Sequence, residues 1–343
     1  MTKNTKFGFV KHLSPIFPSQ IMVDVTEYCN LKCIHCPHPV FQESDLWSGA
    51  QLDINLHKKL IDEIKQDGLG HCNYIRYTSN GEPLIHKKFL EMVQYTNKTV
   101  PSVPINVTTN GRLLTEKKAI ALLEAGVDVF DVSLDAFYDE TYSKIRVKGD
   151  LNVTRKNVLR LIDLIKKNKF KSKLIVSYVE QELNKNETNL FEKFWKESGA
   201  DFVVIRQQHS AAGAVEERKD SMILNQVENK IERKPCLYPW ERLILSPTGY
   251  IGYCPGDWKY KSKFVKFSQT TIKKVWNGEF MNELRKAHMT NDFSCHKFCG
   301  NCPDWENTKW PDEGRSYSNV MNDLMDDEEV KRKKDISVPS DLI

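Results

Sequence analysis

The sequence predicts an α/β protein: six strand–helix units forming a partial (β/α)6 TIM-like barrel, followed by a small C-terminal domain. Two observations lead to this prediction. From about residue 20 to residue 210, short β-branched runs alternate with longer amphipathic stretches, an order typical of parallel sheets with right-handed crossovers. From Cys236 to Trp305 the chain is instead rich in Cys, Trp, Pro and Gly, which suits a small domain held together by metal.

The strands and helices of the barrel are assigned from the period of their apolar residues. The expected strands are Ile21–Val25, Asn73–Tyr77, Ile105–Thr109, Val127–Ser133, Lys173–Val179 and Phe202–Arg206. The expected helices are Leu56–Lys65, Lys87–Tyr95, Glu116–Leu123, Val153–Lys166 and Asn189–Lys196. A closed barrel needs eight such units, and the sequence offers no two further ones, so the barrel is expected to be open.

Changes in composition set the expected domain boundaries. Residues 1–20 are an N-terminal extension, residues 21–222 the barrel, residues 223–310 the small domain and residues 311–343 a charged tail. The segments Ser210–Glu217, small and polar, and Asn225–Pro235, charged, mark the change between the two domains. Within the small domain only Val275–Arg285 is expected to form a helix, and the tail is expected to be weakly ordered.

The overall composition is that of an ordinary globular protein of 343 residues, with a net charge of +4 that is spread along the chain. Nothing in this charge favours nucleic-acid binding. No apolar run approaches the roughly 18–20 residues of a membrane span, and the N-terminus lacks the apolar core of a signal peptide. The protein is therefore expected to be cytoplasmic, without a membrane or nucleic-acid partner.

Nine cysteines require an explanation, since an odd number in a reducing compartment argues against disulfides and for metal binding. Eight of them fall into two groups, within residues 29–36 and residues 236–302. Cys72 stands alone and is expected to be a small buried hydrophobic residue.

The first group, Cys29-Asn-Leu-Lys-Cys33-Ile-His-Cys36, directly follows the first expected strand. Three thiolates at this spacing can hold one face of a four-iron cluster and leave the fourth iron without a protein ligand, whereas iron–sulfur ligation normally uses four cysteines. The alternative is a structural zinc site completed by His35 or His38.

Three further motifs follow the next three strands. Asn80–Pro83 reads Asn-Gly-Glu-Pro, Asn110 lies in Thr109–Gly111, and Ser133–Asp135 ends the fourth strand. The carboxyl ends of parallel strands share the face on which such barrels place their active sites. Each motif alone could be a turn or a helix cap, but the four together predict a functional site.

These motifs resemble those of the radical S-adenosylmethionine (SAM) superfamily, and the resemblance covers about residues 20–310. The C-x3-C-x2-C triplet is the defining motif, with a ring (here His35) before its last cysteine. Asn80–Pro83 is similar to the Gly-Gly-Glu-Pro motif, with Asn80 in place of the first glycine.

The resemblance implies a [4Fe-4S] cluster on Cys29, Cys33 and Cys36 with SAM bound at its open iron. It further implies that Gly81, Glu82 and Pro83 hold the methionine ammonium, that Ser133 and Asp135 face the ribose and methionine, that Arg146 lies near the carboxylate, and that His35 and Asn110 contribute to the same site. One electron, from a donor such as flavodoxin or ferredoxin, would then cleave the cofactor to a 5′-deoxyadenosyl radical that abstracts a substrate hydrogen.

The second group resembles the SPASM/twitch extension of this superfamily. The resemblance implies one auxiliary [4Fe-4S] cluster held by Cys236, Cys254, Cys299 and Cys302, because no cysteine follows Cys302 to build a further one. Cys295 repeats the C-x3-C-x2-C spacing with Cys299 and Cys302, so it is a spare thiol, a substitute ligand or part of another three-cysteine site. A four-cysteine zinc knuckle is the alternative, since thiolate spacing does not distinguish zinc from iron–sulfur.

Members with this extension oxidise alcohols of sugars or aminocyclitols, as 2-deoxy-scyllo-inosamine dehydrogenase does, or modify ribosomal peptides, or mature sulfatases. Only about 20 residues precede the first expected strand, and one auxiliary cluster is expected, which together favour the dehydrogenase type. The resemblance thus implies a radical SAM oxidoreductase acting on a small sugar- or polyol-like substrate. A peptide- or protein-modifying maturase is one alternative, and a non-catalytic metal scaffold or electron carrier is another.

Overall fold

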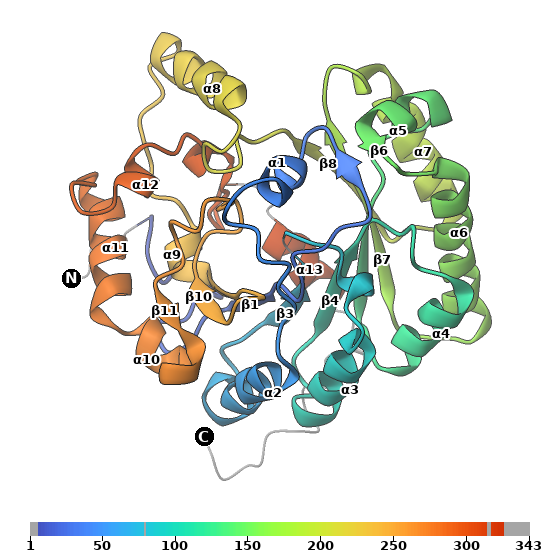
Figure 1. The fold of residues 1–343 in the computed structure, drawn as a ribbon, viewed down its shortest axis with the longest axis horizontal. Coiled ribbons are helices and arrows are strands. Elements are labelled where there is room, and N and C mark those ends of the chain that lie inside the picture. Colours follow the sequence, from blue (N-terminus) through green and yellow to red (C-terminus); the bar gives the residue numbers. More distant parts are fainter. Residues whose placement is uncertain (1–5, 79, 314–316, 326–343) are drawn as a thin grey trace.

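The computed structural model describes residues 6–78, 80–313 and 317–325. Over this range the main sheet has nine strands, in the order β11-β10-β9-β1-β3-β4-β5-β7-β8. The six neighbours from β1 to β8 all run parallel, and they curve around a central space (Figure 1). The sequence-based prediction of a six-stranded open barrel is confirmed.

All six strands of the barrel lie where the apolar runs indicated. They are β1 (Gln20–Val23), β3 (Tyr74–Tyr77), β4 (Ile105–Thr109), β5 (Val129–Ser133), β7 (Lys173–Glu180) and β8 (Phe202–Gln207). Helices cover their outer side (Figure 1): α2 (Ile54–Glu63), α3 (Phe89–Thr99), α4 (Glu116–Glu124), α6 (Leu151–Lys167) and α7 (Thr188–Ser198). Asp53, Thr115 and Asp150 begin three of these helices by accepting hydrogen bonds from backbone N–H groups of the first turn.

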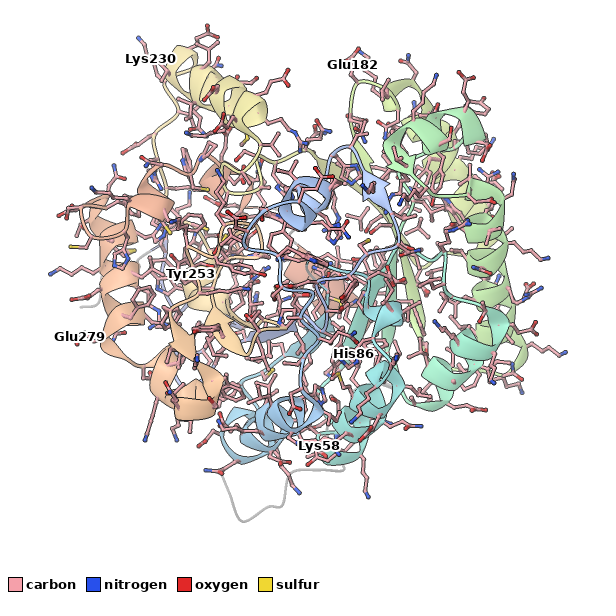
Figure 2. The ribbon with its side chains drawn as sticks, in the orientation of Figure 1. Lys58, His86, Glu182, Lys230, Tyr253 and Glu279 are labelled. Carbon is pink, nitrogen blue, oxygen red and sulfur yellow. The ribbon has the colours of Figure 1, made fainter. Side chains whose placement is uncertain are left out.

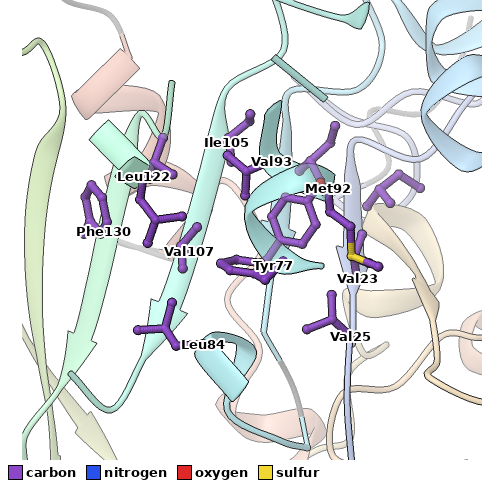
Figure 3. Packing of buried hydrophobic residues seen from close by; sticks show 14 of the residues in the cluster. Val23, Val25, Tyr77, Leu84, Met92, Val93, Ile105, Val107, Leu122 and Phe130 are labelled. Carbon is purple, nitrogen blue, oxygen red and sulfur yellow. The ribbon is translucent and has the colours of Figure 1, made fainter. Parts of the chain in front are cut away.

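Alternate strand residues divide the core into two layers, because successive side chains point to opposite faces of a sheet. Val23, Tyr77 and Val107 face outward and pack with Met92 and Val93 of α3 (Figure 3). The residues between them, such as Arg76 of β3, face the inside of the barrel. This inner layer carries polar side chains near the carboxyl ends of the strands, where the four sequence motifs lie.

The C-terminal part adds three strands to the same sheet. Strand β9 (Arg242–Leu245) runs parallel to β1, β10 (Tyr250–Gly252) runs antiparallel to β9, and β11 (Val265–Lys266) runs antiparallel to β10. The β9–β10 hairpin extends the barrel sheet instead of standing apart. The expected domain boundary at residues 222 and 223 falls within α8 (Glu216–Glu228), and the division into domains stays a prediction.

The expected helix Val275–Arg285 is broken into α10 (Ile272–Trp276) and α11 (Glu279–Thr290). Gly278 lies between them with extended backbone, where a Cβ atom would come within 2.8 Å of the Lys274 carbonyl oxygen. The remaining short helices are α1 (His38–Gln42), α5 (Asp139–Ile145), α9 (Tyr238–Glu241) and α12 (Lys297–Gly300). Over the described residues, no helix combines the length and the apolar character needed to cross a membrane.

Part of the expected tail is a buried helix. Helix α13 (Tyr317–Met325) lies inside the barrel, where Val320, Met321 and Leu324 pack against inward-facing Tyr74, Val129 and Ile175. The difference from the expected weakly ordered tail has a physical reason. The inner face of the sheet near the amino ends of the strands is apolar, and in an open barrel another element must cover it. The charged runs Asp326–Glu329 and Lys331–Lys334 lie outside the described residues.

Candidate functional site

The first cysteine group lies in the loop that leaves the carboxyl end of β1. Within this loop, β2 (Lys32–Cys33) pairs antiparallel with β6 (Arg146–Val147), which places Cys33 opposite Arg146. The Ile34 N–H donates to the Ile145 carbonyl oxygen at 3.0 Å, so the segment after β5 supports the cysteine loop. Cys29, Cys33 and Cys36 lie close enough to one another for their charges to interact.

The chemistry of these thiols fits an iron–sulfur cluster. Burial raises the pKa of Cys29 and of Cys36 to about 12, and it raises the pKa of Cys33 as well. Thiols with such pKa values are protonated at neutral pH, and they become thiolates when a metal centre displaces the proton. Three sulfur ligands suit a four-iron cluster with one iron left for another molecule.

The two histidines of the zinc alternative have protein partners at Nε2. His38 Nε2 donates to the Glu27 carbonyl oxygen at 2.7 Å, and His35 Nε2 lies 3.5 Å from Asp135 Oδ2. Burial lowers the pKa of His35 to about 4, so its ring is neutral at physiological pH. Among the described residues, no three His, Cys, Asp or Glu side chains converge closely enough to bind a single ion.

The Asn80–Pro83 motif packs directly on the cysteine loop. A Cβ atom on Gly81 would lie 2.1 Å from the Thr26 carbonyl oxygen and 2.6 Å from that of Tyr28, so the approach requires glycine. The next residue, Glu82, donates its N–H to the Tyr28 carbonyl oxygen at 2.8 Å. The cysteine loop and the motif loop therefore form one rigid edge, and buried Pro83 begins the short turn that follows.

The Glu82 carboxylate joins the second motif to the third. It is buried and accepts hydrogen bonds from the Thr109 hydroxyl at 2.6 Å and from the Asn110 N–H at 2.8 Å. The Leu84 N–H also donates to it, at 3.2 Å. Since protein donors already engage this carboxylate, backbone carbonyl groups of the loop are the better candidates to accept from a cofactor ammonium.

Asn110 and Asn30 extend this network toward the cysteines. Asn110 Nδ2 donates to Asn30 Oδ1 at 2.8 Å, and Asn30 Nδ2 is buried without a hydrogen-bond partner among the described residues. A buried amide donor of this kind costs free energy unless a ligand accepts from it. Asn30 was not selected from the sequence, although it lies within the cysteine motif.

Asp135 and Arg146 form a buried ion pair. Arg146 Nε and Nη2 donate to Asp135 Oδ2 at 2.8 and 2.5 Å, and the Val179 N–H donates to Oδ1 at 2.7 Å. Asp135 has a φ of +65°, a left-handed conformation that aspartate tolerates better than most residues. Ser133 lies at the end of β5, half-buried and in register with Ser177 of β7. The structure thus brings these predicted cofactor residues to one end of the barrel, with Asp135 and Arg146 engaged by each other.

The second cysteine group also gathers in one place. The Cys254 thiol interacts electrostatically with Cys236, Cys299 and Cys302. Burial raises the pKa of Cys236 and of Cys302 to about 12 and that of Cys299 to about 11, so these thiols also need a metal centre to become thiolates. Cys295 is exposed and contacts Ser294, whose hydroxyl lies 3.9 Å from its sulfur.

Arg233 and Tyr253 support this second group. Arg233 Nη2 and Nη1 donate to the carbonyl oxygens of Cys299 and Gly300 at 2.6 and 2.8 Å. The Tyr253 hydroxyl lies 3.5 Å from the Cys299 sulfur, inside the C-terminal part of the molecule (Figure 2). Both arrangements place positive charge or a hydroxyl donor beside the sulfur atoms, which is how proteins adjust the potential of iron–sulfur clusters.

Comparison with known proteins matches one family model to the region of each cysteine group. The family model "Radical SAM superfamily" matches residues 23–188, and the SPASM model, "Iron-sulfur cluster-binding domain", matches residues 236–303. Curated relatives include GTP 3′,8-cyclases of Limosilactobacillus fermentum, 32% identical over 38% of each chain, and of Clostridium botulinum, 31% identical over 42% of this chain and 43% of the relative. The chain thus covers less than half the length of these relatives.

Solved structures share the fold. BtrN in complex with AdoMet and 2-DOIA has a TM-score of 0.55 at 20% identity, over 83% of this chain and 92% of BtrN. Streptococcus suis SuiB bound to precursor peptide SuiA has a TM-score of 0.61 at 13% identity, over 90% of this chain and 73% of SuiB. Native anSMEcpe with bound AdoMet has a TM-score of 0.59 at 15% identity, over 92% of this chain and 98% of anSMEcpe.

The two matched family models together take in more than half of the chain, and each contains one of the two cysteine groups. They imply [4Fe-4S] clusters and SAM as the cofactors. The chain belongs to the radical SAM superfamily and carries a C-terminal SPASM iron–sulfur cluster-binding domain.

Proposed function

We propose that the chain is an oxidoreductase that cleaves SAM reductively and oxidises an alcohol of a small, polar, sugar-like substrate. The observation that supports it best is the contact between the loops beside the two cysteine groups. The loop that leaves Cys254 packs on the loop that carries Cys29: the Tyr260 hydroxyl donates to Glu27, and Trp258 packs on Phe41 and His38. A substrate held between the two sites would have a radical source on one side and an electron acceptor on the other.

Cys29, Cys33 and Cys36 would hold the first cluster. The Asn30 amide, whose Nδ2 has no partner among the described residues, and the carbonyl groups around Gly81 would hold SAM. When bound, the cluster and SAM supply the radical chemistry. The chain's own part is to orient them. Glu82 fixes the loops at Tyr28 and Asn110 relative to each other, through its N–H and its carboxylate respectively, and the Asp135–Arg146 pair fixes the position of Cys33. The aromatic layer of Phe41, Trp47 and Trp258 would exclude water.

Cys236, Cys254, Cys299 and Cys302 would hold the second cluster, which would make two [4Fe-4S] clusters per chain, and Cys295 would hold none. An alcohol oxidation releases one hydrogen atom, one proton and one further electron, so a second one-electron centre suits this reaction. The structure of BtrN with 2-DOIA supports a small substrate by its similarity in fold. Flavodoxin or ferredoxin is the proposed electron donor.

A peptide substrate is the second candidate. It is favoured by the similarity in fold to SuiB bound to precursor peptide SuiA, with a TM-score of 0.61, and to anSMEcpe with Cp18Cys peptide, with a TM-score of 0.58. The names of the curated relatives add GTP to the substrates that deserve a test.

The test is an anaerobic screen of the reconstituted protein with SAM and a chemical reductant. Polyols, aminocyclitols and nucleotide sugars are compared with GTP and short peptides, and 5′-deoxyadenosine and product masses are measured. The proposal requires a mass loss of about 2 Da on an alcohol substrate, equal in amount to the 5′-deoxyadenosine formed. Turnover with a peptide or GTP alone would rule out the sugar substrate, and no 5′-deoxyadenosine at all would support a non-catalytic scaffold.

A further inference from the structure

A buried carboxyl group lies at the end of β1, among the motifs described above. Ile21, Val23 and Val25 pack outward against the helices, so Asp24 points toward the inside of the barrel. Its side chain is 3% exposed and accepts hydrogen bonds from the N–H groups of Thr26 and Asn80. Asn80 is the first residue of the Asn80–Pro83 motif, so Asp24 lies directly against the proposed cofactor loop.

Lys263 faces the Asp24 carboxyl group from the C-terminal part of the chain, which carries the second cysteine group. It belongs to the segment between Cys254 and β11, and its Nζ is buried without a hydrogen-bond acceptor among the described residues. The ammonium lies 3.1 Å from the centre of the Tyr260 ring, and its strongest charge interaction is with Asp24. A buried amino group without an acceptor is costly in a folded protein, and a substrate oxygen would remove that cost.

The other charged and titratable groups near this pair are occupied by the protein. Glu27 accepts from the Tyr260 hydroxyl, the Ser48 hydroxyl and the Ala50 N–H. Asp257 accepts from the Ser262 N–H at 2.6 Å and from the Lys259 N–H at 3.1 Å. Asp24 and Lys263 are therefore the pair left to exchange a proton with a bound molecule.

The protonation of this pair suits proton transfer near neutral pH. Burial raises the pKa of Asp24, and burial lowers the pKa of Lys263, while each group partly offsets the shift of the other. A general base is most effective when its pKa lies near the working pH. A buried acid and a buried amine whose pKa values shift toward neutrality, placed beside the cofactor motifs, are candidates for proton transfer in an active site.

We propose that Lys263 hydrogen-bonds to the hydroxyl oxygen of the substrate and that Asp24 accepts the proton of that hydroxyl. This inference rests on the alcohol oxidation proposed above. In that reaction the carbon–hydrogen bond would give a hydrogen atom to the radical that SAM supplies, and the oxygen would give its proton to Asp24. The one remaining electron would go to a one-electron acceptor, the chemistry that a second cluster would supply, as the carbonyl forms. The acid limb of the rate profile then reflects Asp24, since the base must be ionised, and the alkaline limb reflects Lys263, since the amine must be protonated.

The experiment compares Asp24→Asn and Lys263→Met with Lys261→Met, an exposed lysine of the same segment. In the absence of substrate, SAM cleavage is expected to stay within about two-fold of the wild type in Lys261→Met, and 5′-deoxyadenosine is measured in the other two variants so that product formation can be expressed per SAM cleaved. With the substrate found in the screen, product formation is expected to fall about 100-fold in Asp24→Asn, within the usual contribution of a general base. It is expected to fall in Lys263→Met as well, because the hydrogen bond to the substrate oxygen is lost, and to stay unchanged in Lys261→Met. The acid limb of the pH profile should disappear in Asp24→Asn.

An infrared titration of the cluster-loaded protein tests the pair without turnover. A buried protonated carboxyl group is expected to give a carbonyl band that titrates near neutral pH in the wild type, is absent in Asp24→Asn, and titrates at higher pH in Lys263→Met. If no such band exists, or if both variants keep wild-type product yields and pH profiles, the inference is overturned. A wild type that makes no 5′-deoxyadenosine would contradict the proposed function instead, and the infrared result would still decide the protonation of the pair.

Discussion

Replacing Gly81 with alanine tests whether the motif loop and the cysteine loop act as one unit. The new Cβ atom would lie 2.1 Å from the Thr26 carbonyl oxygen, whereas ordinary van der Waals contact begins at 3.4 Å, so one of the two loops must move by about 1 Å. No side-chain rotation can absorb this shift, because the three atoms nearest to the Cβ, which are Thr26 O, Tyr28 O and Thr26 C, all belong to the backbone. The hydrogen bond from Glu82 N–H to Tyr28, worth about 0.5–1.5 kcal/mol, would lengthen as well.

Such a displacement next to reacting groups is expected to lower the rate of SAM cleavage about 100-fold. The assay measures 5′-deoxyadenosine formation and the SAM dissociation constant, alongside iron content. Iron content should remain that of the wild type, since the cysteines are untouched. Gly252→Ala is the matched control, because its Cβ would lie 3.3 Å from the Ser262 hydroxyl, which can rotate, and at ordinary van der Waals distance from the Ser262 carbonyl oxygen (3.4 Å) and Lys263 Cγ (3.6 Å). Wild-type SAM affinity and cleavage in Gly81→Ala would refute the close packing of the two loops.

Four further predictions concern the metal sites and the inner helix. Replacing the three cysteines of the first group by alanine should remove about half of roughly eight irons per chain, as iron analysis would show, and should abolish SAM cleavage. Cys302→Ala should lose the second cluster, whereas Cys295→Ala should keep its absorption spectrum; the reverse result would show that Cys295 is the ligand. Tyr253→Phe should make the reduction potential of the second cluster more negative in a titration followed by electron paramagnetic resonance, because it removes the hydroxyl beside the Cys299 sulfur. Leu324→Ala should lower the free energy of unfolding by about 2–5 kcal/mol in chemical denaturation, and no change would mean that α13 does not pack inside the barrel.

The sequence was sufficient for features that depend on local pattern. The β-branched runs predicted all six barrel strands because a strand buried on both sides needs a continuous apolar stretch, and the cysteine spacing predicted which thiols gather because ligands of one centre lie on short loops. The break at Gly278 was missed, although an Asn-Gly pair inside a helical pattern signals one.

Features that depend on distant pairing could not be predicted. Nothing local in Arg242–Leu245 indicates that it joins β1 in parallel, since the pairing depends on backbone hydrogen bonds that any strand can form. Helix α13 had a weak signal, because Tyr317, Val320, Met321 and Leu324 recur at helical spacing, but its partners are scattered over several strands, from β3 to β8. Asp24 and Lys263 could be recognised as candidate proton-transfer residues only from the structure, because they lie far apart in the sequence and are brought together by the fold.

The parallel pairing of β1 with β9 also affects how the chain folds. Strand β1 is made early in synthesis, yet one of its two edges stays open until the ribosome has added the residues up to Leu245. Pairings between such distant segments form slowly, and an open edge in the meantime is a site for aggregation. A barrel produced without its C-terminal part would keep that edge exposed beside the cysteine loop. Strand β9 of the SPASM segment therefore covers the open edge of β1. The first cysteine site can be fully enclosed only after this segment has been synthesised.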